Sequence, residues 1–246
     1  MMSDVPHPFD ADAYWSSRLN EHWGLTGVGH QEYPEHYNRW LYRRKRAVLR
    51  RALGGRVIGE ALDLGSGTGW VVQQLKAAGA TRVAGCELTA VGVDRLRGEH
   101  PDVSFHRVEI GVDPLPAGTA SIDTVTMLDV IYHLVDDAKF EQALAEIARV
   151  LRPGGAAIIT DTLAASSQQP GEHVVFRGRD RWDPALSAVG LRIASTHPYF
   201  KALSHPREAT WRHWWHPRLR GPVEWAMDTV LPLRPWLRLA VIERVT

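Results

Sequence analysis

The chain has 246 residues, of which 44% are hydrophobic and 23% charged, a composition that excludes a disordered, collagen-like or coiled-coil protein. Lys and Arg total 29 against 28 Asp and Glu. A protein with so small a net charge is not expected to bind nucleic acid or an anionic membrane through its overall charge. The single cysteine, Cys86, excludes an internal disulfide and a thiolate metal cluster, which suits a reducing compartment. Because there is no signal-peptide pattern and no run of about 18 apolar residues, we expect a cytoplasmic protein without integral membrane association.

The first 55 residues combine aromatic and basic side chains. Their aromatic content is too high for a disordered tail, so we expect residues 1–55 to form a helical cap, with three of them contacting the substrate: Tyr14, Trp15 and Tyr37. Seven basic residues then occur between positions 39 and 51, in a stretch from Glu35 to Glu60 that has no acid between its ends. We interpret them as the solvated face of a helix that turns Leu41, Val48 and Leu49 inward, with an anion-binding face as the alternative: Arg39, Arg43, Arg44, Lys45, Arg46, Arg50 and Arg51.

Strands and helices alternate through the centre of the chain. Short apolar runs predict strands at 61–64, 82–86, 103–108, 121–128 and 156–161, with helices at 70–78, 90–98 and 138–151 between them. A weaker helix at 184–189 precedes strands at 191–195 and 237–245. Such alternation is typical of an α/β fold with a doubly wound, mostly parallel, seven-stranded sheet. We therefore expect one α/β domain over residues 56–246, with 197–236 inserted before the last strand as a cap over the substrate.

A glycine-rich loop, Asp63-Leu64-Gly65-Ser66-Gly67-Thr68-Gly69, lies between the first predicted strand and helix. Glycines at such a turn let the backbone approach a ligand closely. The spacing disfavours a dinucleotide, because the third glycine comes one residue early and Trp70 fills the expected position; the absence of a following Lys-Ser or Lys-Thr pair disfavours a nucleoside triphosphate. Glu87, about 20 residues further on, ends the second strand, where an acid can bind ribose hydroxyls. Loop and acid together predict an adenosine-like ligand.

Residues 61–163 resemble the class I S-adenosylmethionine-dependent methyltransferases. The resemblance rests on four motifs in order: ALDLGSGTGW at the loop, GCEL at the second strand, IDTVTMLDVIYHL at the fourth, and EIARVLRPGGAAIITD leading into the fifth. It implies a Rossmann-like fold, S-adenosylmethionine as cofactor and S-adenosylhomocysteine as product. It also implies cofactor-binding roles for the loop and the strand ends: Asp63, Gly65, Ser66, Gly67, Gly69, Glu87, Leu88 and Leu128.

The adenine contact departs from the family pattern, which often has an acid just after the third strand, near Gly111 here. Glu109 is the preferred substitute, and Asp113 or the backbone near Ile110 are the alternatives.

The chemical step needs few residues, because alignment of the acceptor and removal of its proton are the main tasks of the protein. His133 follows the fourth strand and is the best candidate for a general base, since an imidazole with a pKa near ~6.5 accepts protons at neutral pH. A packing role for His133 is the alternative. Tyr132 lines the substrate cavity or fills core, and Asp129 is interpreted as a cap of the following turn.

The tail contributes two further substrate candidates, Trp211 and Trp214, whose rings offer stacking surfaces. No His-Glu-x-x-His motif and no Cys/His set with zinc spacing occurs, so we expect no metal. The predicted function is methyl transfer to oxygen or nitrogen of a small or medium-sized acceptor, as in specialised metabolism. A glycan, lipid or peptide acceptor is the alternative within the family, and a catalytically silent cofactor-binding regulator is the alternative outside it. The oligomeric state stays open, with a homodimer as one candidate.

Overall fold

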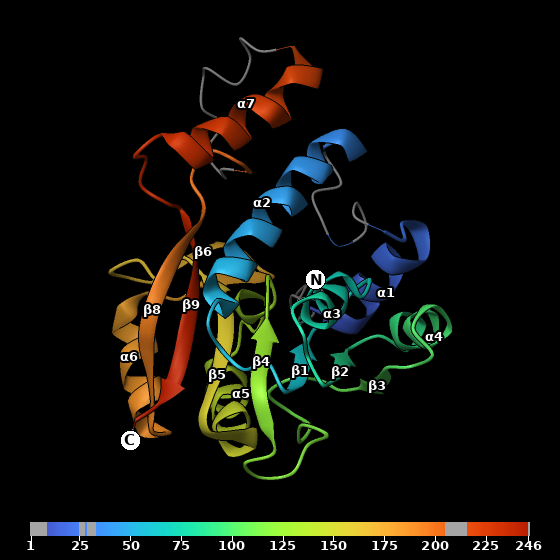
Figure 1. Ribbon diagram of the computed structural model, residues 1–246, viewed down its shortest axis with the longest axis vertical. Coiled ribbons are helices and arrows are strands. Elements are labelled where there is room, and N and C mark those ends of the chain that lie inside the picture. The colour runs from blue at the N-terminus through green and yellow to red at the C-terminus, as the bar shows by residue number, and fades with distance from the viewer. Residues whose placement is uncertain (1–8, 25–27, 29–32, 205–215, 246) are drawn as a thin grey trace, which may run out of the picture.

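The computed structural model describes residues 9–24, 28, 33–204 and 216–245. Its main sheet has seven strands in the order β3-β2-β1-β4-β5-β9-β8 (Figure 1). Strands β1 to β5 are parallel, whereas β9 is antiparallel to both β5 and β8. The predicted doubly wound, mostly parallel, seven-stranded sheet is therefore confirmed. The strand bounds are β1 Glu60–Leu64, β2 Arg82–Glu87, β3 Ser104–Arg107, β4 Ile122–Met127, β5 Leu151–Asp161, β8 Leu191–Phe200 and β9 Leu237–Arg244.

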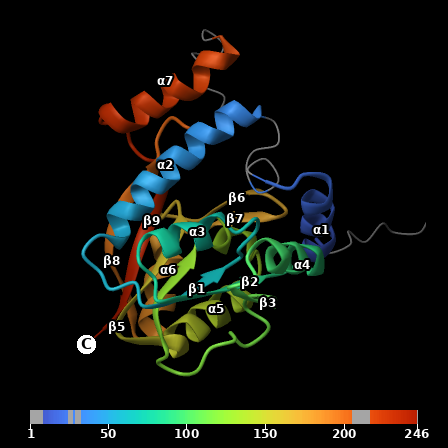
Figure 2. The same ribbon diagram turned by 45° about the vertical axis from the view of Figure 1, so that its right-hand side comes forward.

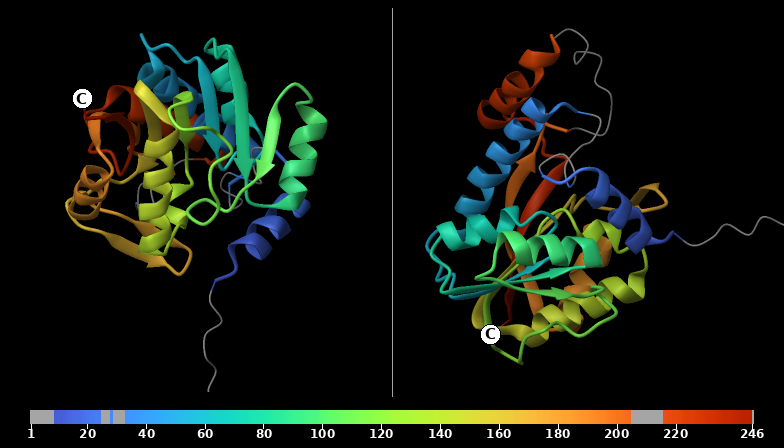
Figure 3. Two further views of the ribbon diagram at one scale, coloured as in Figure 1. Left: turned by 90° about the horizontal axis from the view of Figure 1, so that it is seen from below. Right: turned by 90° about the vertical axis from the view of Figure 1, so that its right-hand side faces the viewer.

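Helices cover both faces of the sheet (Figure 3). Neighbouring side chains on β5 point to opposite faces: Ile158 packs in the core with helices α3 and α4, and Ile159 packs in the core with α5 and α6. Both side chains are almost fully buried. Apolar strands buried on both sides are typical of a parallel sheet between two helical layers. The helix bounds are α3 Trp70–Ala77, α4 Ala90–Glu99, α5 Asp137–Val150 and α6 Arg179–Ala188.

Two helices precede the sheet. Helix α1 (Ala11–Glu21) begins at Asp10, whose side chain accepts a hydrogen bond from Ala13 N at 3.0 Å, and it lies beside α4. Helix α2 (Glu35–Leu53) coincides with the basic stretch, and its inner face carries Leu41, Val48 and Leu49 as expected. Helix α7 (Pro217–Val230) packs along α2, and the two project together from one end of the sheet (Figure 2).

Several features differ from the predicted elements: α6 begins at Arg179 rather than 184, β8 continues to Phe200 rather than ending at 195, and α7 was not predicted. A hairpin of β6 (Gln168–Gly171) and β7 (Val174–Phe176) and a short 3₁₀ turn, η1 (Ile131–His133), were not predicted. Both segments are too short to show a periodic pattern. Strand β5 also begins earlier than expected, at Leu151 rather than Ala156, because Leu151 already pairs with Ile122 of β4 before an irregularity in the register. Among the described residues, no helix is long and apolar enough to cross a membrane.

Candidate functional site

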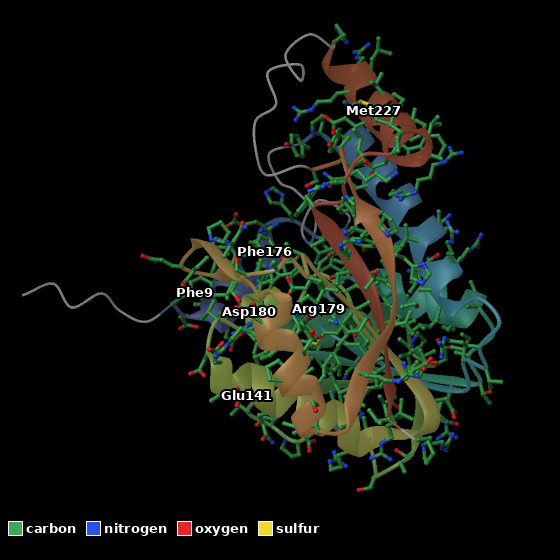
Figure 4. The ribbon with its side chains drawn as sticks, turned by 90° about the vertical axis from the view of Figure 1, so that its left-hand side faces the viewer. Phe9, Glu141, Phe176, Arg179, Asp180 and Met227 are labelled. Atoms are coloured by element: carbon green, nitrogen blue, oxygen red, sulfur yellow. The ribbon has the colours of Figure 1, made fainter. Side chains whose placement is uncertain are left out.

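A cavity of about 440 Å³ lies where β1, β2, β3 and β4 end. In parallel α/β sheets, ligands bind at the carboxyl ends of the strands. The wall includes the loop after β1, the residues that end or follow the other three strands, and parts of α1 and α2. Figure 4 views the molecule from the side and labels Phe9, which is part of this wall.

The glycine loop brings main-chain groups to the cavity. Gly65 and Gly67 have φ angles of +75° and +53°, which favour glycine, and both line the wall with Ser66. A Cβ added to Gly65 would lie under 3.0 Å from the Val130 side chain, and one added to Gly67 would lie 2.8 Å from Val28 Cγ1. Neither position has room for a side chain, so the backbone itself forms the surface of the cavity.

Two residues assigned to the cofactor by resemblance lie outside the cavity wall. Gly69 begins α3, and a Cβ there would lie 2.7 Å from His100 Nε2 and 3.0 Å from Leu96, so this glycine serves the packing of α3 on α4. Asp63 is buried beneath the loop, with Oδ1 accepting a hydrogen bond from Thr126 Oγ1 at 2.7 Å. Asp63 Oδ2 has no hydrogen-bond partner within the described part of the chain. Burial raises the pKa of Asp63 to about 6.

Glu87 lies in the wall beside the loop. Its Oε2 accepts a hydrogen bond from Gly67 N at 2.9 Å, and its Oε1 accepts two from Thr89, from N and from Oγ1, each at 3.1 Å. Burial raises the pKa of Glu87, whereas these donors oppose the increase. The carboxylate thus joins the loop to the end of β2.

The remaining predicted cofactor contacts, Leu88, Glu109, Ile110 and Leu128, also line the cavity. Glu109 forms an ion pair with Lys139 at 2.6 Å and is about half exposed. Asp113, the alternative adenine contact, lies outside this wall and accepts a hydrogen bond from Glu109 N at 2.8 Å.

His133 lines the cavity from η1. Its Nδ1 lies 2.9 Å from the carbonyl oxygen of His173; because a carbonyl only accepts, Nδ1 carries the hydrogen and Nε2 carries a lone pair. Burial lowers the pKa of His133 to about 4. The Trp15 ring, also in the wall, meets the His133 ring edge-on at 5.1 Å. Tyr14 is outside the wall and packs against His173 at 5.5 Å.

The other predicted substrate contacts lie elsewhere. Tyr37 is buried between α2 and α7, where its hydroxyl donates to Glu224 and accepts a hydrogen bond from Ser204 N at 3.0 Å. Tyr132 lies outside the wall, against Phe176 at 5.1 Å. Trp211 and Trp214 lie outside the described residues. Among the described residues, none beyond Tyr199 lines the cavity, so α7 covers α2 and not the site.

Two charged wall residues were interpreted wrongly from the sequence. Lys45 was placed on a solvated helix face, and Asp129 was interpreted as a turn cap; instead Lys45 Nζ lies 2.6 Å from Asp129 Oδ2 inside the cavity wall. The sequence held a signal for Lys45, which stands four residues after Leu41 and three before Val48 on the apolar face of the helix. Tyr42 and Tyr199 complete this part of the wall.

Comparison with known proteins decides the family. Residues 61–155 match a family model described as a methyltransferase domain. Residues 61–155 of the chain therefore carry a methyltransferase domain of the class I S-adenosylmethionine-dependent family. The cofactor of this family is S-adenosylmethionine, and the resemblance inferred from the four motifs is confirmed.

Two curated relatives methylate different atoms according to their names. A dimethylglycine N-methyltransferase from Parasynechococcus marenigrum is 32% identical over 117 residues, which cover 46% of this chain and 41% of that protein. The O-methyltransferase cnsE from Penicillium expansum is 31% identical over 147 residues, covering 58% of this chain and 52% of that protein. The matched region thus spans about half or less of these relatives. Among solved structures, the DhpI–SAH complex has a TM-score of 0.59 at 17% identity, covering 95% of this chain and 94% of that one, which shows the fold alone.

The residues present fit S-adenosylmethionine. Gly65, Ser66 and Gly67 line the cavity, and because Gly65 and Gly67 have no side chains their main-chain groups can approach a ligand closely. A carboxylate, Glu87, stands in the wall at the end of β2, where ribose hydroxyls are bound in related folds. Among residues 9–24, 28, 33–204 and 216–245, no group of three or more His, Cys, Asp or Glu side chains is placed to hold a metal ion.

Proposed function

We propose that this protein transfers a methyl group from S-adenosylmethionine to an oxygen or nitrogen atom of a small or medium-sized acceptor. The observation that carries the proposal is the composition of one wall: the glycine loop and Glu87 line the same cavity as the imidazole of His133. A cofactor-binding surface and a proton acceptor in one cavity are the parts that such a transfer requires.

S-adenosylmethionine supplies an activated methyl group when bound, so the protein has to orient the acceptor and remove its proton. His133 has the state required for the second task. Its Nε2 is unprotonated at neutral pH, because the pKa is lowered to about 4 and Nδ1 donates to His173 O. We propose that Nε2 accepts the proton of the acceptor hydroxyl or amine. With this lowered pKa the His133 imidazole is unprotonated at neutral pH and can accept a proton, although it is a weaker base than free imidazole.

The size and cover of the cavity favour a small acceptor. Its volume of about 440 Å³ is at the low end of the range for small-molecule sites, about 300–1,000 Å³. Phe9, Trp15 and Leu19 supply apolar side chains from the N-terminal segment. Such a cover excludes water from the reacting atoms. The relatives named for N- and O-methylation support either atom as the acceptor. The buried, unpaired Cys86 is consistent with a cytoplasmic location.

The test is transfer of a labelled methyl group from S-adenosylmethionine to a panel of small phenols, alcohols, amines and carboxylates. The proposal expects label in at least one small acceptor, and loss of that label in the Glu87→Ala variant. Lys76→Met is the matched control, because Lys76 pairs with Asp102 away from the cavity. Label only in glycans, lipids or peptides would overturn the acceptor class, and cofactor binding without any transfer would indicate the silent regulator.

A further inference from the structure

A buried ion pair lies in the cavity wall on the far side of the glycine loop from Glu87. Glu87 ends β2, Asp129 follows β4, and β1 with its loop lies between these strands. Lys45 reaches Asp129 from α2. If Glu87 marks the ribose end of the cavity, this pair therefore lies toward the opposite, amino-acid end of the cofactor.

The surroundings hold both groups in place. The Lys45 and Asp129 side chains are only 10% and 21% exposed, and their charged atoms are 2.6 Å apart. Lys45 Nζ also lies 4.5 Å from the centre of the Tyr42 ring, and Thr160 Oγ1 donates to Asp129 Oδ1 at 3.2 Å. A buried charge is tolerated only when it is paired and hydrogen-bonded. The Asp129 carboxylate raises the pKa of Lys45 against the effect of its burial.

The backbone of Asp129 is strained. Its φ angle is +61°, in the left-handed region that favours glycine, and its amide donates to Thr160 Oγ1 at 2.6 Å. Such conformations cost about 1–3 kcal/mol and cluster at ligand sites. A strained residue with a partly buried carboxylate in the wall of a cavity is a stronger indication of ligand binding than the ion pair alone.

Asp63, to which the resemblance gives a cofactor-binding role, is 1% exposed and is absent from the wall. Asp129 is in the wall and has a cationic partner beside it. We propose that Lys45 and Asp129 bind the amino-acid end of S-adenosylmethionine. In this arrangement Lys45 Nζ forms an ion pair with the cofactor carboxylate, and the Asp129 carboxylate forms one with the cofactor ammonium group.

This inference rests on the proposed function, because it assumes that S-adenosylmethionine occupies the cavity. A zwitterion suits a preformed ion pair, since each protein charge gains an opposite charge and none becomes buried without a partner. Tyr42 and Tyr199 border the pair as neutral groups, because burial raises the pKa of both hydroxyls.

Two ligands distinguish binding of the amino-acid end of the cofactor from binding of the rest of it. S-adenosylhomocysteine carries the amine and the carboxylate, whereas 5′-methylthioadenosine keeps the adenosine and the sulfur but has neither charge. Calorimetric titration of both ligands into wild type, Lys45→Met, Asp129→Asn and the double variant is the experiment. The double variant leaves no unpaired buried charge, so its fold is less at risk than that of either single variant. Lys76→Met is the matched control.

The inference expects each cavity variant to lose about tenfold or more in affinity for S-adenosylhomocysteine, in line with charged hydrogen bonds, and to keep its affinity for 5′-methylthioadenosine. Unchanged S-adenosylhomocysteine affinity would overturn it and leave the proposed function standing. An equal loss for both ligands would also overturn it, because the pair would then support the whole cavity. If wild type bound neither ligand, the proposed function itself would fail.

Discussion

His133 Nδ1 lies 2.9 Å from the main-chain oxygen of His173, and the two imidazole rings stack at 6.0 Å with an angle of 8° between their planes. The contact joins η1, which follows β4, to the turn of the β6–β7 hairpin. It fixes which nitrogen of His133 is unprotonated, because the carbonyl can only accept. The hairpin thus sets the chemical state of a residue 40 positions earlier in the sequence.

Replacing His133 by Ala is expected to lower kcat by about 10²–10⁴-fold, the range for loss of a general base. Binding of S-adenosylhomocysteine should be nearly unchanged, because the glycine loop and Glu87 are retained. Steady-state kinetics with the acceptor found by the labelling assay, together with calorimetry, measure both quantities. Unchanged turnover would remove His133 from the mechanism and leave it a packing role.

His133 also predicts a pH dependence of stability. Its folded-state pKa of about 4 lies below the ordinary 6.5, so between these values the unfolded chain binds a proton that the folded chain does not. His133 alone should therefore lower the free energy of unfolding by about 2 kcal/mol between about pH 7.5 and about pH 5. The raised pKa values of the buried carboxyls of Asp63 and Asp161 act in the opposite direction, so the effect is measured as the difference between wild type and a His133 variant. Denaturant unfolding at about pH 7.5 and about pH 5 measures this for wild type and His133→Gln. A variant with the same pH dependence as wild type would contradict the lowered pKa.

The glycine loop offers a matched pair of substitutions. Gly65 and Gly79 both have positive φ angles, of +75° and +94°, but a Cβ at Gly79 meets nothing within 4 Å, whereas one at Gly65 meets Val130. Both Gly→Ala changes carry similar backbone strain, about 1–2 kcal/mol. Only Gly65→Ala should weaken binding of S-adenosylhomocysteine, by about tenfold or more, because the loop has to shift. Equal affinities in the two variants would show that the loop does not form the cofactor surface.

Tyr37→Phe tests whether this tyrosine supports the fold and not the substrate site. Its hydroxyl holds Glu224 and Ser204 N between α2 and α7, and both partners are buried. Removing it should lower the free energy of unfolding by about 1–3 kcal/mol and leave the acceptor KM unchanged. A raised KM for the acceptor in Tyr37→Phe, with unaltered stability, would show that Tyr37 contacts the substrate after all.

Local sequence patterns were enough to predict the sheet and the loop. Gly65, Gly67 and Glu87 lie in or next to segments whose spacing reveals strand, turn and helix without any distant contact. The mostly parallel pairing of the strands follows from the alternation of these units. These residues lie where the patterns placed them, around one cavity.

The rest depends on contacts between distant segments. Lys45 reaches Asp129 only because α2 docks against the sheet, and a count of basic residues alone suggests a solvated face. The state of His133 depends on His173, in a hairpin too short to predict. Gly69 fits the loop motif but serves the packing of α3 against His100. In each case the partner is far away in sequence, and pattern reasoning does not identify it.

The proposed function requires that the cavity bind S-adenosylmethionine. Calorimetric titration of wild-type protein with S-adenosylhomocysteine, with NADH as the control ligand, tests it most directly. We expect saturable binding of S-adenosylhomocysteine with one site per chain, and no binding of NADH. Binding of NADH alone, or of neither ligand, would contradict it.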